Sequence, residues 1–449
     1  MSGALQAVFQ NQRSFGAPNI INYMSVTSRD VRTRSVAYLP SGNTVSVGTI
    51  GGLWGLLSPM TPTGVRSVYN NPTNNYIACC SDNFTGDVWS VSADNSSNYY
   101  GYGNTTISSN NGNPTMFIAK YNSSGTAVFS RKFTNLMSSS FGFMRIGKDG
   151  NMYIARQDTL FNAPRYMNVM KLSVTGTPSI TWQITRRNNN VESWGTDVDA
   201  DASGNIYVSG SSNPGTIEGC VIKFSSTTTT GNSGVVSWQR KLSLSGVGVY
   251  LQAIRLDSAD NVYVVATDSN SNTLYLVKYN SSGALQWQRR VTGLTTNQNG
   301  QMAVDSSNNI YIIWNVSNTS NVVLKYDSSG AIQWQRSFYT TTTNKYLYMF
   351  GVATFATNMA LTGYSSGTTG VSSTVTVTLP TDGTKTGTLG TVANSVVVSY
   401  AASSYTDSAG NLTDAAGDLA NDGNTSYTLD PDTMQNAPQT VTSTSQTIV

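Results

Sequence analysis

The chain contains no histidine, and only Glu192 and Glu218 represent glutamate among its 449 residues. Histidine is the commonest general base and metal ligand, and paired carboxylates carry most glycosidase chemistry. A Ser-His-Asp or Cys-His site therefore cannot be built. We expect no catalytic residues, no metal site and no cofactor, and hence a protein that is not an enzyme.

Charge is also scarce, because charged residues make up 11% of the chain, against about a quarter in an ordinary soluble domain. Serine, threonine, asparagine and glycine supply the polarity instead, which is common in extracellular and viral β-proteins. The formal net charge of +3 is spread over the whole chain. A basic surface for nucleic acid is not expected.

Cysteine is limited to Cys79, Cys80 and Cys220, which predicts buried thiols and no disulfide framework. The first residues lack a basic stretch followed by a long apolar core, and no apolar run approaches the roughly 18 residues that span a bilayer. We expect synthesis in a host cytoplasm without a secretory signal, and no membrane insertion.

A repeat is the strongest positive feature of the sequence. It reads KDGNMYIA at 148–155, DASGNIYVSG at 201–210, DSADNVYVVA at 257–266 and DSSNNIYIIW at 305–314. The tyrosines Tyr153, Tyr207, Tyr263 and Tyr311 are separated by 54, 56 and 48 residues. That period suits four short strands with turns and is too long for helical-pair or leucine-rich repeats.

One period, residues 195–242, divides into four strand-like segments, GTDVDAD, NIYVSGS, GCVIKFS and VVSWQRK, separated by turn residues. Asp197, Asp199 and Asp201 crowd the first segment and its turn, where such aspartates usually cap backbone amides rather than bind calcium. Fainter copies of the second strand stand at 41–48, 85–92 and 356–363, with Trp89 in the tyrosine place. Seven copies predict an all-β fold, a β-propeller of about seven four-stranded blades.

These motifs resemble the bacterial seven-bladed β-propeller repeat family, whose units read D-x-x-G-N-x-Y-V followed by K-Y/F-x-x-x-G-x-x-x-W. The matches run from Asp201 to Val208, Lys278 to Trp287 and Lys325 to Trp334. The resemblance covers about half of the chain and implies the fold more than a function, because one propeller scaffold carries many activities.

The two ends differ from the middle. We expect residues 1–34 to form a docking segment, 35–400 the propeller, and 401–449 either an extended tail or a strand that closes the ring. The N-terminal segment is basic, and no basic residue follows Lys385, although six aspartates do. Polar ends of this kind gain order mainly through partners.

The first fifteen residues, MSGALQAVFQNQRSF, resemble the opening of structural proteins of marine-type tailed bacteriophages. Their apolar and hydrogen-bonding side chains are candidates for docking into a neighbouring virion protein: Leu5, Val8, Phe9, Arg13 and Phe15. The alternative is that this segment is a strand that closes the propeller.

Three further features are candidate surfaces. Residues 93–115 read as the longest loop, and its Tyr99, Tyr100 and Tyr102 are the candidate receptor contacts. The repeat also aligns a lysine and a tryptophan in successive blades, for which we favour packing between blades over binding of an anionic polymer or a sugar. These residues are Lys120, Lys171, Lys223, Lys278, Lys325, Trp182, Trp238, Trp287 and Trp334.

Together these observations favour a non-enzymatic structural protein of a tailed bacteriophage virion. It would be a tail fibre, nozzle or adhesin-like component, present in several copies. Its partners would be other virion proteins and a glycan or protein of the host surface. Two alternatives stay open, a decoration protein of the capsid and a secreted or cell-surface carbohydrate-binding propeller.

Overall fold

The computed structural model describes part of the chain, and every long element in that part is a β-strand. The described residues are 20–26, 31–50, 54–60, 77–78, 86–106, 114–124, 126–134, 139–159, 165–187, 191–226, 235–269, 273–294, 300–367, 371–392, 395–416, 420–421, 428–431 and 441–447. Within these ranges no helix is long and apolar enough to cross a membrane.

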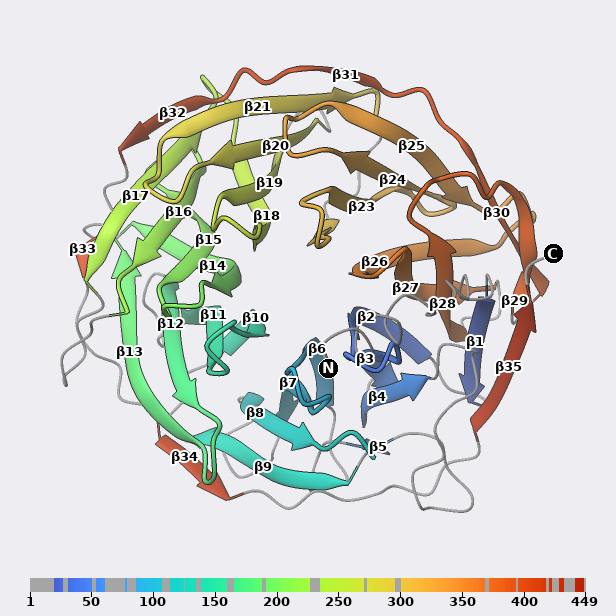
Figure 1. Cartoon of the computed structure of the whole chain (residues 1–449), viewed down its shortest axis with the longest axis horizontal. Helices are drawn as coiled ribbons and strands as arrows, with labels where there is room; N and C mark the ends of the chain where they lie inside the picture. Colours follow the sequence, from blue (N-terminus) through green and yellow to red (C-terminus); the bar gives the residue numbers. More distant parts are fainter. Residues whose placement is uncertain are drawn as a thin grey trace, which may run out of the picture.

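The strands form seven antiparallel sheets around a central axis, as Figure 1 shows. We name each sheet a blade and number it in chain order. Blade 1 contains β2 (Val31–Tyr38), β3 (Thr44–Ile50), β4 (Trp54–Met60) and β5 (Ile77–Ala78). Blade 2 contains β6 (Gly86–Ala93), β7 (Tyr99–Thr106), β8 (Pro114–Tyr121) and β9 (Ala127–Thr134). Blade 3 contains β10 (Ser139–Ile146), β11 (Met152–Thr159), β12 (Arg165–Ser173) and β13 (Ser179–Arg187).

The next four blades follow the same order from the axis outward. Blade 4 contains β14 (Glu192–Ala200), β15 (Ile206–Asn213), β16 (Glu218–Phe224) and β17 (Val236–Ser243). Blade 5 contains β18 (Val249–Leu256), β19 (Val262–Asp268), β20 (Leu274–Tyr279) and β21 (Leu285–Thr292). Blade 6 contains β22 (Gly300–Val304), β23 (Ile310–Ser317), β24 (Ser320–Tyr326) and β25 (Ile332–Tyr339). Blade 7 contains β26 (Tyr346–Phe355), β27 (Asn358–Ser366), β28 (Ser372–Pro380) and β1 (Ile20–Val26).

The expected all-β propeller is confirmed, and the four segments of residues 195–242 correspond to β14, β15, β16 and β17. Six blades are complete, with four strands of at least five residues each. Blade 1 is the exception, because its fourth strand, β5, has two residues in the part of the chain that the structure describes. Where about seven four-stranded blades were expected, the described residues thus form six complete blades and one smaller sheet.

One expected repeat copy was wrong. Residues 86–92 of that copy lie on β6, the innermost strand of blade 2, and not on a second strand. The true copy is Asp94, Asn98 and Tyr100 on the next hairpin, where the hydroxyl of Tyr100 donates to Asp94 Oδ2 at 3.0 Å. The prediction was wrong because Trp89 is also a large aromatic residue in a hydrophobic strand, but that strand, β6, precedes the second strand of the blade.

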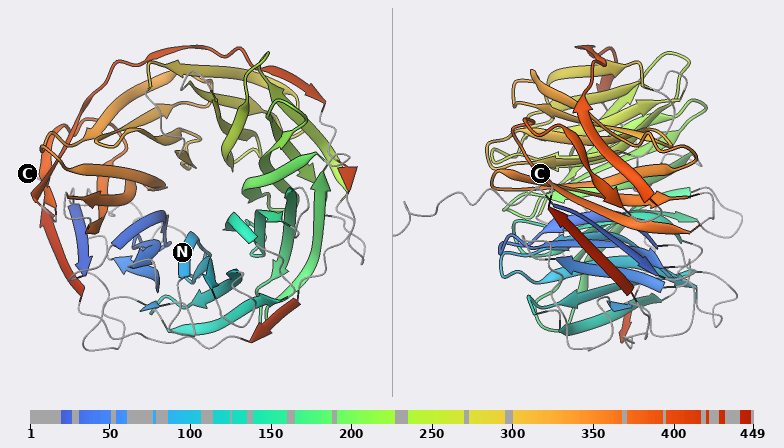
Figure 2. Two further views of the ribbon diagram at one scale, coloured as in Figure 1. Left: turned by 180° about the vertical axis from the view of Figure 1, so that it is seen from behind. Right: turned by 90° about the vertical axis from the view of Figure 1, so that its right-hand side faces the viewer.

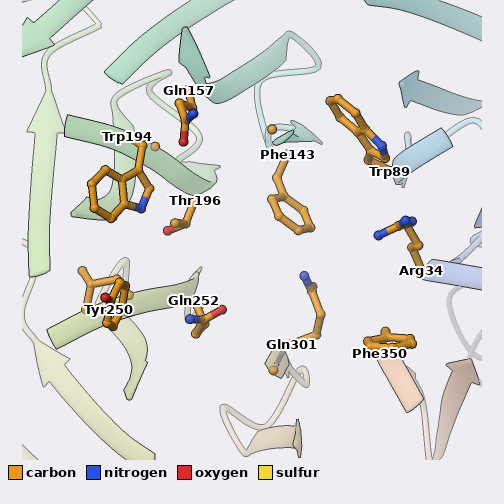
Figure 3. A pocket seen from close by; sticks show the side chains of 14 residues that line it. Arg34, Trp89, Phe143, Gln157, Trp194, Thr196, Tyr250, Gln252, Gln301 and Phe350 are labelled. Atoms are coloured by element: carbon orange, nitrogen blue, oxygen red, sulfur yellow. The ribbon is translucent and has the colours of Figure 1, made fainter. Parts of the chain in front are cut away.

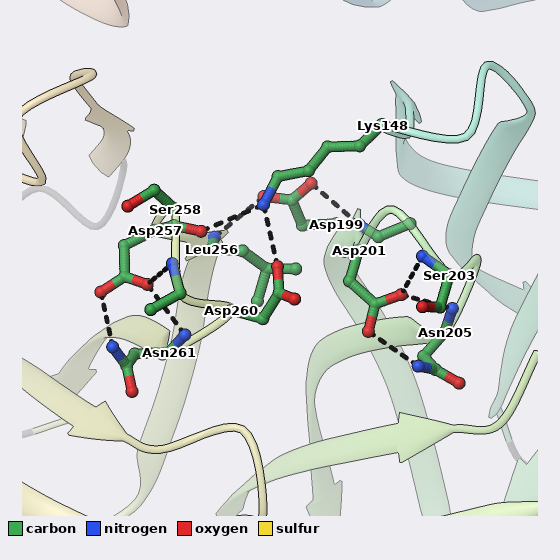
Figure 4. A network of polar contacts seen from close by, with 12 residues as sticks. Lys148, Asp199, Asp201, Ser203, Asn205, Leu256, Asp257, Ser258, Asp260 and Asn261 are labelled. Carbon is green, nitrogen blue, oxygen red and sulfur yellow. Dashed lines mark hydrogen bonds and ion pairs between the residues drawn. The ribbon is translucent and has the colours of Figure 1, made fainter.

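The repeated aspartate, asparagine and tyrosine build one turn. Asp201 Oδ1 accepts hydrogen bonds from the backbone N–H groups of Ser203 and Asn205 at 3.0 and 2.9 Å. Its Oδ2 accepts from Asn205 Nδ2 at 2.8 Å and from the Tyr207 hydroxyl at 3.2 Å. Figure 4 shows this turn beside the equivalent one at Asp257. The carboxylate thus caps the turn and satisfies a buried tyrosine, as polar groups in a core require.

The repeated lysines and tryptophans connect neighbouring blades, as expected. Lys278 Nζ lies 5.1 Å from the centroid of the Tyr263 ring and donates to the carbonyl oxygen of Ser328 in the next blade at 2.8 Å. Trp287 donates from Nε1 to the same carbonyl oxygen at 3.3 Å. The same pattern recurs at Lys223 with Trp238 and at Lys325 with Trp334. These side chains belong to the packing between blades.

The N-terminal strand closes the ring. β1 pairs antiparallel with β28, so it is the fourth strand of blade 7, and β2 begins blade 1. Residues 20–26 and 31–34 of the segment expected to dock therefore lie in the propeller. The closing strand proposed as an alternative for the first fifteen residues lies outside the described residues and stays a prediction.

The C-terminal segment runs around the outside of the ring and adds strands to six blades (Figure 1). We call it the belt. It is formed by β29 (Gly387–Val392) and β30 (Val396–Ala402) at blade 6, β31 (Thr406–Ala409) at blade 5, β32 (Thr413–Ala416) at blade 4, β33 (Ala420–Asn421) at blade 3, β34 (Thr428–Pro431) at blade 2 and β35 (Val441–Thr447) at blade 7. The edge-on view in Figure 2 shows β35 on the outer wall. The belt covers strand edges that would otherwise be open to other chains.

Candidate functional site

The innermost strands share one irregularity that directs side chains into the central channel. A register shift of the bulge type interrupts the pairing of first and second strands in six blades. In five of them the unpaired residue occupies the same place in the repeat: Arg34, Trp89, Thr196, Gln252 and Phe350. A bulge turns a side chain away from the regular pleat, and bulges are frequent next to binding sites.

These positions surround a cavity of about 440 Å³ (Figure 3). Its walls come from the innermost strand of every blade, β2, β6, β10, β14, β18, β22 and β26, and from Gln157 on β11. The two remaining equivalent positions are Gly142 and Gly300, which also line it. The channel is therefore hollow at this level, and its seven equivalent positions hold two glycines and five different larger residues.

The chemistry of the lining is aromatic and amide-rich. Its aromatic side chains are Trp89, Phe143, Trp194, Tyr250 and Phe350, and its amides are Gln157, Gln252 and Gln301. Arg34 supplies the charge, and Thr196 a hydroxyl. No aspartate or glutamate is among the described residues that line the cavity. Such a wall offers flat apolar faces and neutral hydrogen-bonding groups, and no acid-base pair.

Trp194 and Tyr250 form the most continuous part of this wall. They come from adjacent blades, each two residues before a bulged position, with ring centroids 6.4 Å apart and planes at 36°. Both rings are half-buried. Among the described residues, the side chains of Tyr250 and Gln252 make no hydrogen bond. These groups are available to a bound molecule.

The carboxylates near the channel are engaged inside the wall. Burial raises the pKa of Asp197 to about 7, against the lowering effect of Arg145 and of backbone hydrogen bonds. Asp197 also forms a close ion pair with Arg255 and accepts a hydrogen bond from the backbone N–H of Ile254 at 3.2 Å. Asp199 accepts from the backbone N–H of Leu256 at 3.0 Å. These acids join blade 4 to blade 5, as amide caps, and do not face the cavity.

The tyrosines expected to contact a receptor are core residues. Tyr99, Tyr100 and Tyr102 lie on β7 and are 0%, 1% and 0% exposed. The sequence predicts one long loop over 93–115, but this segment contains the β6–β7 turn and all of β7, the second strand of blade 2. The prediction was wrong because tyrosines with small residues between them are also typical of a buried strand.

Leu5, Val8, Phe9, Arg13 and Phe15 lie outside the described residues, so their docking role stays a prediction. Cys220 is a buried free thiol, as expected, whereas Cys79 and Cys80 are also outside the described ranges. Asp201 caps its turn, as the sequence suggested.

The cavity residues were missed by sequence reasoning, although a signal was present. Each equivalent position stands three residues before the one that pairs with the repeated second-strand position, as Thr196 stands three residues before Asp199, which pairs with Tyr207. That second-strand position is a tyrosine in blades 2 to 6, and Val45 and Ala360 in blades 1 and 7. Along the chain this column reads Arg, Trp, Gly, Thr, Gln, Gly and Phe. A column that varies inside a strong repeat is what a binding site requires, whereas packing positions repeat.

A family model described as the haemagglutinin repeat matches residues 191–289, which span blades 4 and 5. No curated protein matches the chain. Among solved structures, a protein of unknown function from Dyadobacter fermentans is similar at 8% identity with a TM-score of 0.45, covering 68% of this chain and 97% of that one. A Trypanosoma rangeli sialidase in complex with the inhibitor DANA is similar at 9% identity and a TM-score of 0.38, covering 79% and 55%. Likenesses this distant carry no conclusion about what the chain binds or does.

Proposed function

We propose that this chain is a non-enzymatic, adhesin-like structural protein that holds an uncharged glycan in the channel cavity. The observation that carries the proposal is the lining itself, which draws aromatic and amide side chains from around the whole ring and includes no carboxylate. The haemagglutinin-repeat match over blades 4 and 5 supports an adhesin-like role.

A sugar ring suits this lining because it has an apolar face and a rim of hydroxyl groups. The apolar face stacks on an aromatic ring such as Trp194 or Tyr250, and the hydroxyl groups bond to amides such as Gln252. A single arginine, Arg34, is a weak basis for binding a polyanion, which needs several cations. We therefore favour neutral over acidic sugars.

Turnover is not part of the proposal. Hydrolysis of a glycosidic bond normally uses two carboxyl groups on opposite sides of that bond. The lining strand β14 carries Glu192, Asp197 and Asp199, none of which is among the described residues that line the cavity, and Asp197 is fully buried in its ion pair with Arg255. The site can hold a glycan but has no group placed to protonate a leaving oxygen or activate water.

Within this role we propose that the protein is a component of a tailed bacteriophage particle, as a tail fibre, nozzle or adhesin-like part. The opening residues MSGALQAVFQNQRSF and the low charge support it. Leu5, Val8, Phe9, Arg13 and Phe15 would dock to other virion proteins, in several copies per particle. The cavity equally favours a secreted or cell-surface carbohydrate-binding propeller, in which no particle is involved.

Two measurements test the proposal. Electron cryo-microscopy of particles from the source is expected to place the propeller at the tail, and its absence there would favour the secreted form. Binding of the purified chain to an array of neutral and acidic glycans is expected to select neutral ones and to be lost in Trp194→Ala. Release of free sugar by the purified chain would contradict a non-enzymatic role.

A further inference from the structure

We infer that the outer edges of the blades form a repeated peptide-binding site. Each blade binds seven residues of an extended chain, and the belt is the ligand. The inference is independent of the glycan proposal. It rests on pairing registers, hydrogen bonds and a correspondence between belt and blade residues.

The register between belt and blades advances by seven residues per blade. Arg336 of blade 6 pairs with Ala402, Arg289 of blade 5 with Ala409, and Arg240 of blade 4 with Ala416. These arginines stand at equivalent places, each two residues after the repeated tryptophan. One heptad of the belt therefore matches one blade.

On the fourth strands of blades 5 and 6, a glutamine holds the belt backbone at both its donor and its acceptor. Gln335 donates from Nε2 to the carbonyl oxygen of Tyr405 at 3.0 Å, and its Oε1 accepts from the Tyr405 N–H at 2.8 Å. Gln288 makes the same pair of bonds to Leu412, at 2.9 and 3.0 Å. Tyr405 and Leu412 are seven residues apart, and each packs against a successive core between blades.

A carboxylate follows two residues later and joins two blades. Asp407 forms a close ion pair with Arg289 of blade 5 and accepts from the Tyr326 hydroxyl of blade 6 at 2.9 Å. Asp414 lies 3.8 Å from Arg240 of blade 4 and accepts from the Tyr279 hydroxyl of blade 5 at 2.9 Å. The two sites are copies of one socket, made of an arginine and a tyrosine.

The belt changes where the socket changes. At blade 3 the arginine place is taken by Ile184, and the neighbouring tyrosine place on blade 4 by Phe224. The belt residue in register there is Asn421, which pairs with Arg186 as Asp414 pairs with Leu242. Among the belt strands at blades 3 to 5, an acid stands in register at the two complete sockets, and an amide where both the arginine and the tyrosine are replaced. A frayed tail would show no such correspondence.

The belt sequence itself repeats. Asp407-Ser-Ala-Gly-Asn-Leu-Thr is followed by Asp414-Ala-Ala-Gly-Asp-Leu-Ala. Gly410 has a structural reason, because a Cβ there would lie 2.5 Å from Gln288 Cβ and its N–H donates to the Gln288 carbonyl oxygen at 2.9 Å. The ligand class is thus an extended chain of the form D-x-x-G-x-L-x, repeated once per blade.

Two deletions in the full chain test the register. Removing residues 404–410 brings Leu412, Asp414 and Leu419 into the places of Tyr405, Asp407 and Leu412. Removing only residues 404–406 puts Ser408, Gly410 and Ala415 there. We expect the larger deletion to retain hydrogen-exchange protection of β21 within about threefold and the smaller one to lose about tenfold or more. Equal loss, or greater loss in the larger deletion, would overturn the inference.

A pair of substitutions tests it where the deletions prevent folding. Asp414→Thr removes the carboxylate, and Asp414→Thr with Thr413→Asp moves it one residue along the strand, to the other face, without changing composition. Both are expected to lower the melting temperature equally, by about 2 °C. Recovery of the parent melting temperature in the double variant would show that only net charge matters and would overturn the inference.

Discussion

The inner and outer strands of the blades follow opposite rules. In five blades the innermost strand keeps a bulge at one place in the repeat, with a different side chain there in each, among them Arg34, Trp89 and Gln252. Fourth strands of blades 4 to 6 keep the same Trp-Gln-Arg sequence, in which the tryptophans, the arginines and two of the glutamines contact a neighbouring blade or the belt. In this repeat protein, equivalent positions that keep one residue type belong to the scaffold, and equivalent positions that differ in residue type belong to the candidate site.

The largest effect is expected from removing the belt. Ending the chain at residue 394 removes the buried side chains of Val396, Val398, Tyr400 and Leu412. Each large apolar side chain contributes about 1.5–3 kcal/mol when buried, so we expect the melting temperature to fall by about 10 °C or more. Thermal unfolding followed by circular dichroism measures this change. A fall in melting temperature of less than about 2 °C would contradict a stabilising role of the belt on the outer strands.

The same residue type can be tested on both sides of the blade. Trp287→Ala is expected to destabilise the protein by about 2 kcal/mol, because the ring packs between blades, with Tyr263 at 6.0 Å. Trp194→Ala is expected to leave the melting temperature nearly unchanged and to weaken glycan binding by about tenfold or more. Thermal unfolding gives the melting temperature of each variant, and glycan-array titration gives the glycan affinity of each. Equal stability loss in the two variants would contradict the division of roles.

A smaller effect should follow from completing the third socket. Asn421→Asp alone puts an acid in register with Arg186, at a blade where Ile184 and Phe224 replace the arginine and tyrosine of the socket, and is expected to change stability little. Adding Ile184→Arg and Phe224→Tyr is expected to raise stability, with a coupling of about 1 kcal/mol. Denaturant unfolding of the single, double and triple variants measures that coupling. Additive effects on the free energy of unfolding would show that the acid does not interact with the introduced arginine and tyrosine.

The smallest effect concerns pH. At Asp382 a hydrogen bond from the Thr384 backbone N–H lowers the carboxyl pKa. At Asp327 burial opposes the lowering, but hydrogen bonds from Ser329 and Ala331 outweigh it, so that pKa is also low. A lowered folded pKa adds stability above the unfolded value of about 4, and this stability is lost as pH falls through the folded value.

We therefore expect the Asp327→Asn and Asp382→Asn double variant to lose less stability than the parent between pH 5 and pH 2. The difference is expected to be small, because both carboxylates are largely exposed. Melting temperatures across that range measure it, and parallel curves for the two proteins would contradict the assignment. These turns lie on neither the cavity nor the belt, so they serve as a neutral reference for both.

Much of the fold could be predicted from the repeat. Asp201, Asn205 and Tyr207 mark a turn and a buried strand by local chemistry, and the structure confirms each of them. Trp89 and Tyr100 show where this failed, because two neighbouring strands of blade 2 both carry an aromatic in a hydrophobic stretch. Local pattern cannot tell which of two such strands is the inner one, since that depends on which pairs with a third.

The candidate site depended on closure of the ring. Trp194 and Tyr250 are 56 residues apart in the chain, and only the packing of blade 4 against blade 5 brings their rings to 6.4 Å. The tyrosines of β7 failed as receptor contacts for the converse reason. Their exposure depends on whether neighbouring blades cover them, and β7 is covered on both faces.

The sequence by itself determined the all-β repeat, the turn chemistry, the packing roles of the repeated lysines and tryptophans, and the absence of histidine-dependent chemistry. These follow from residue type and local spacing, which act over one hairpin or one blade. Only the tertiary structure decided that β1 closes the ring, that the acidic C-terminal segment is a belt, and that the seven equivalent positions of the innermost strands face one cavity. Those facts rest on contacts between distant parts of the chain, and a local repeat does not say which distant parts meet.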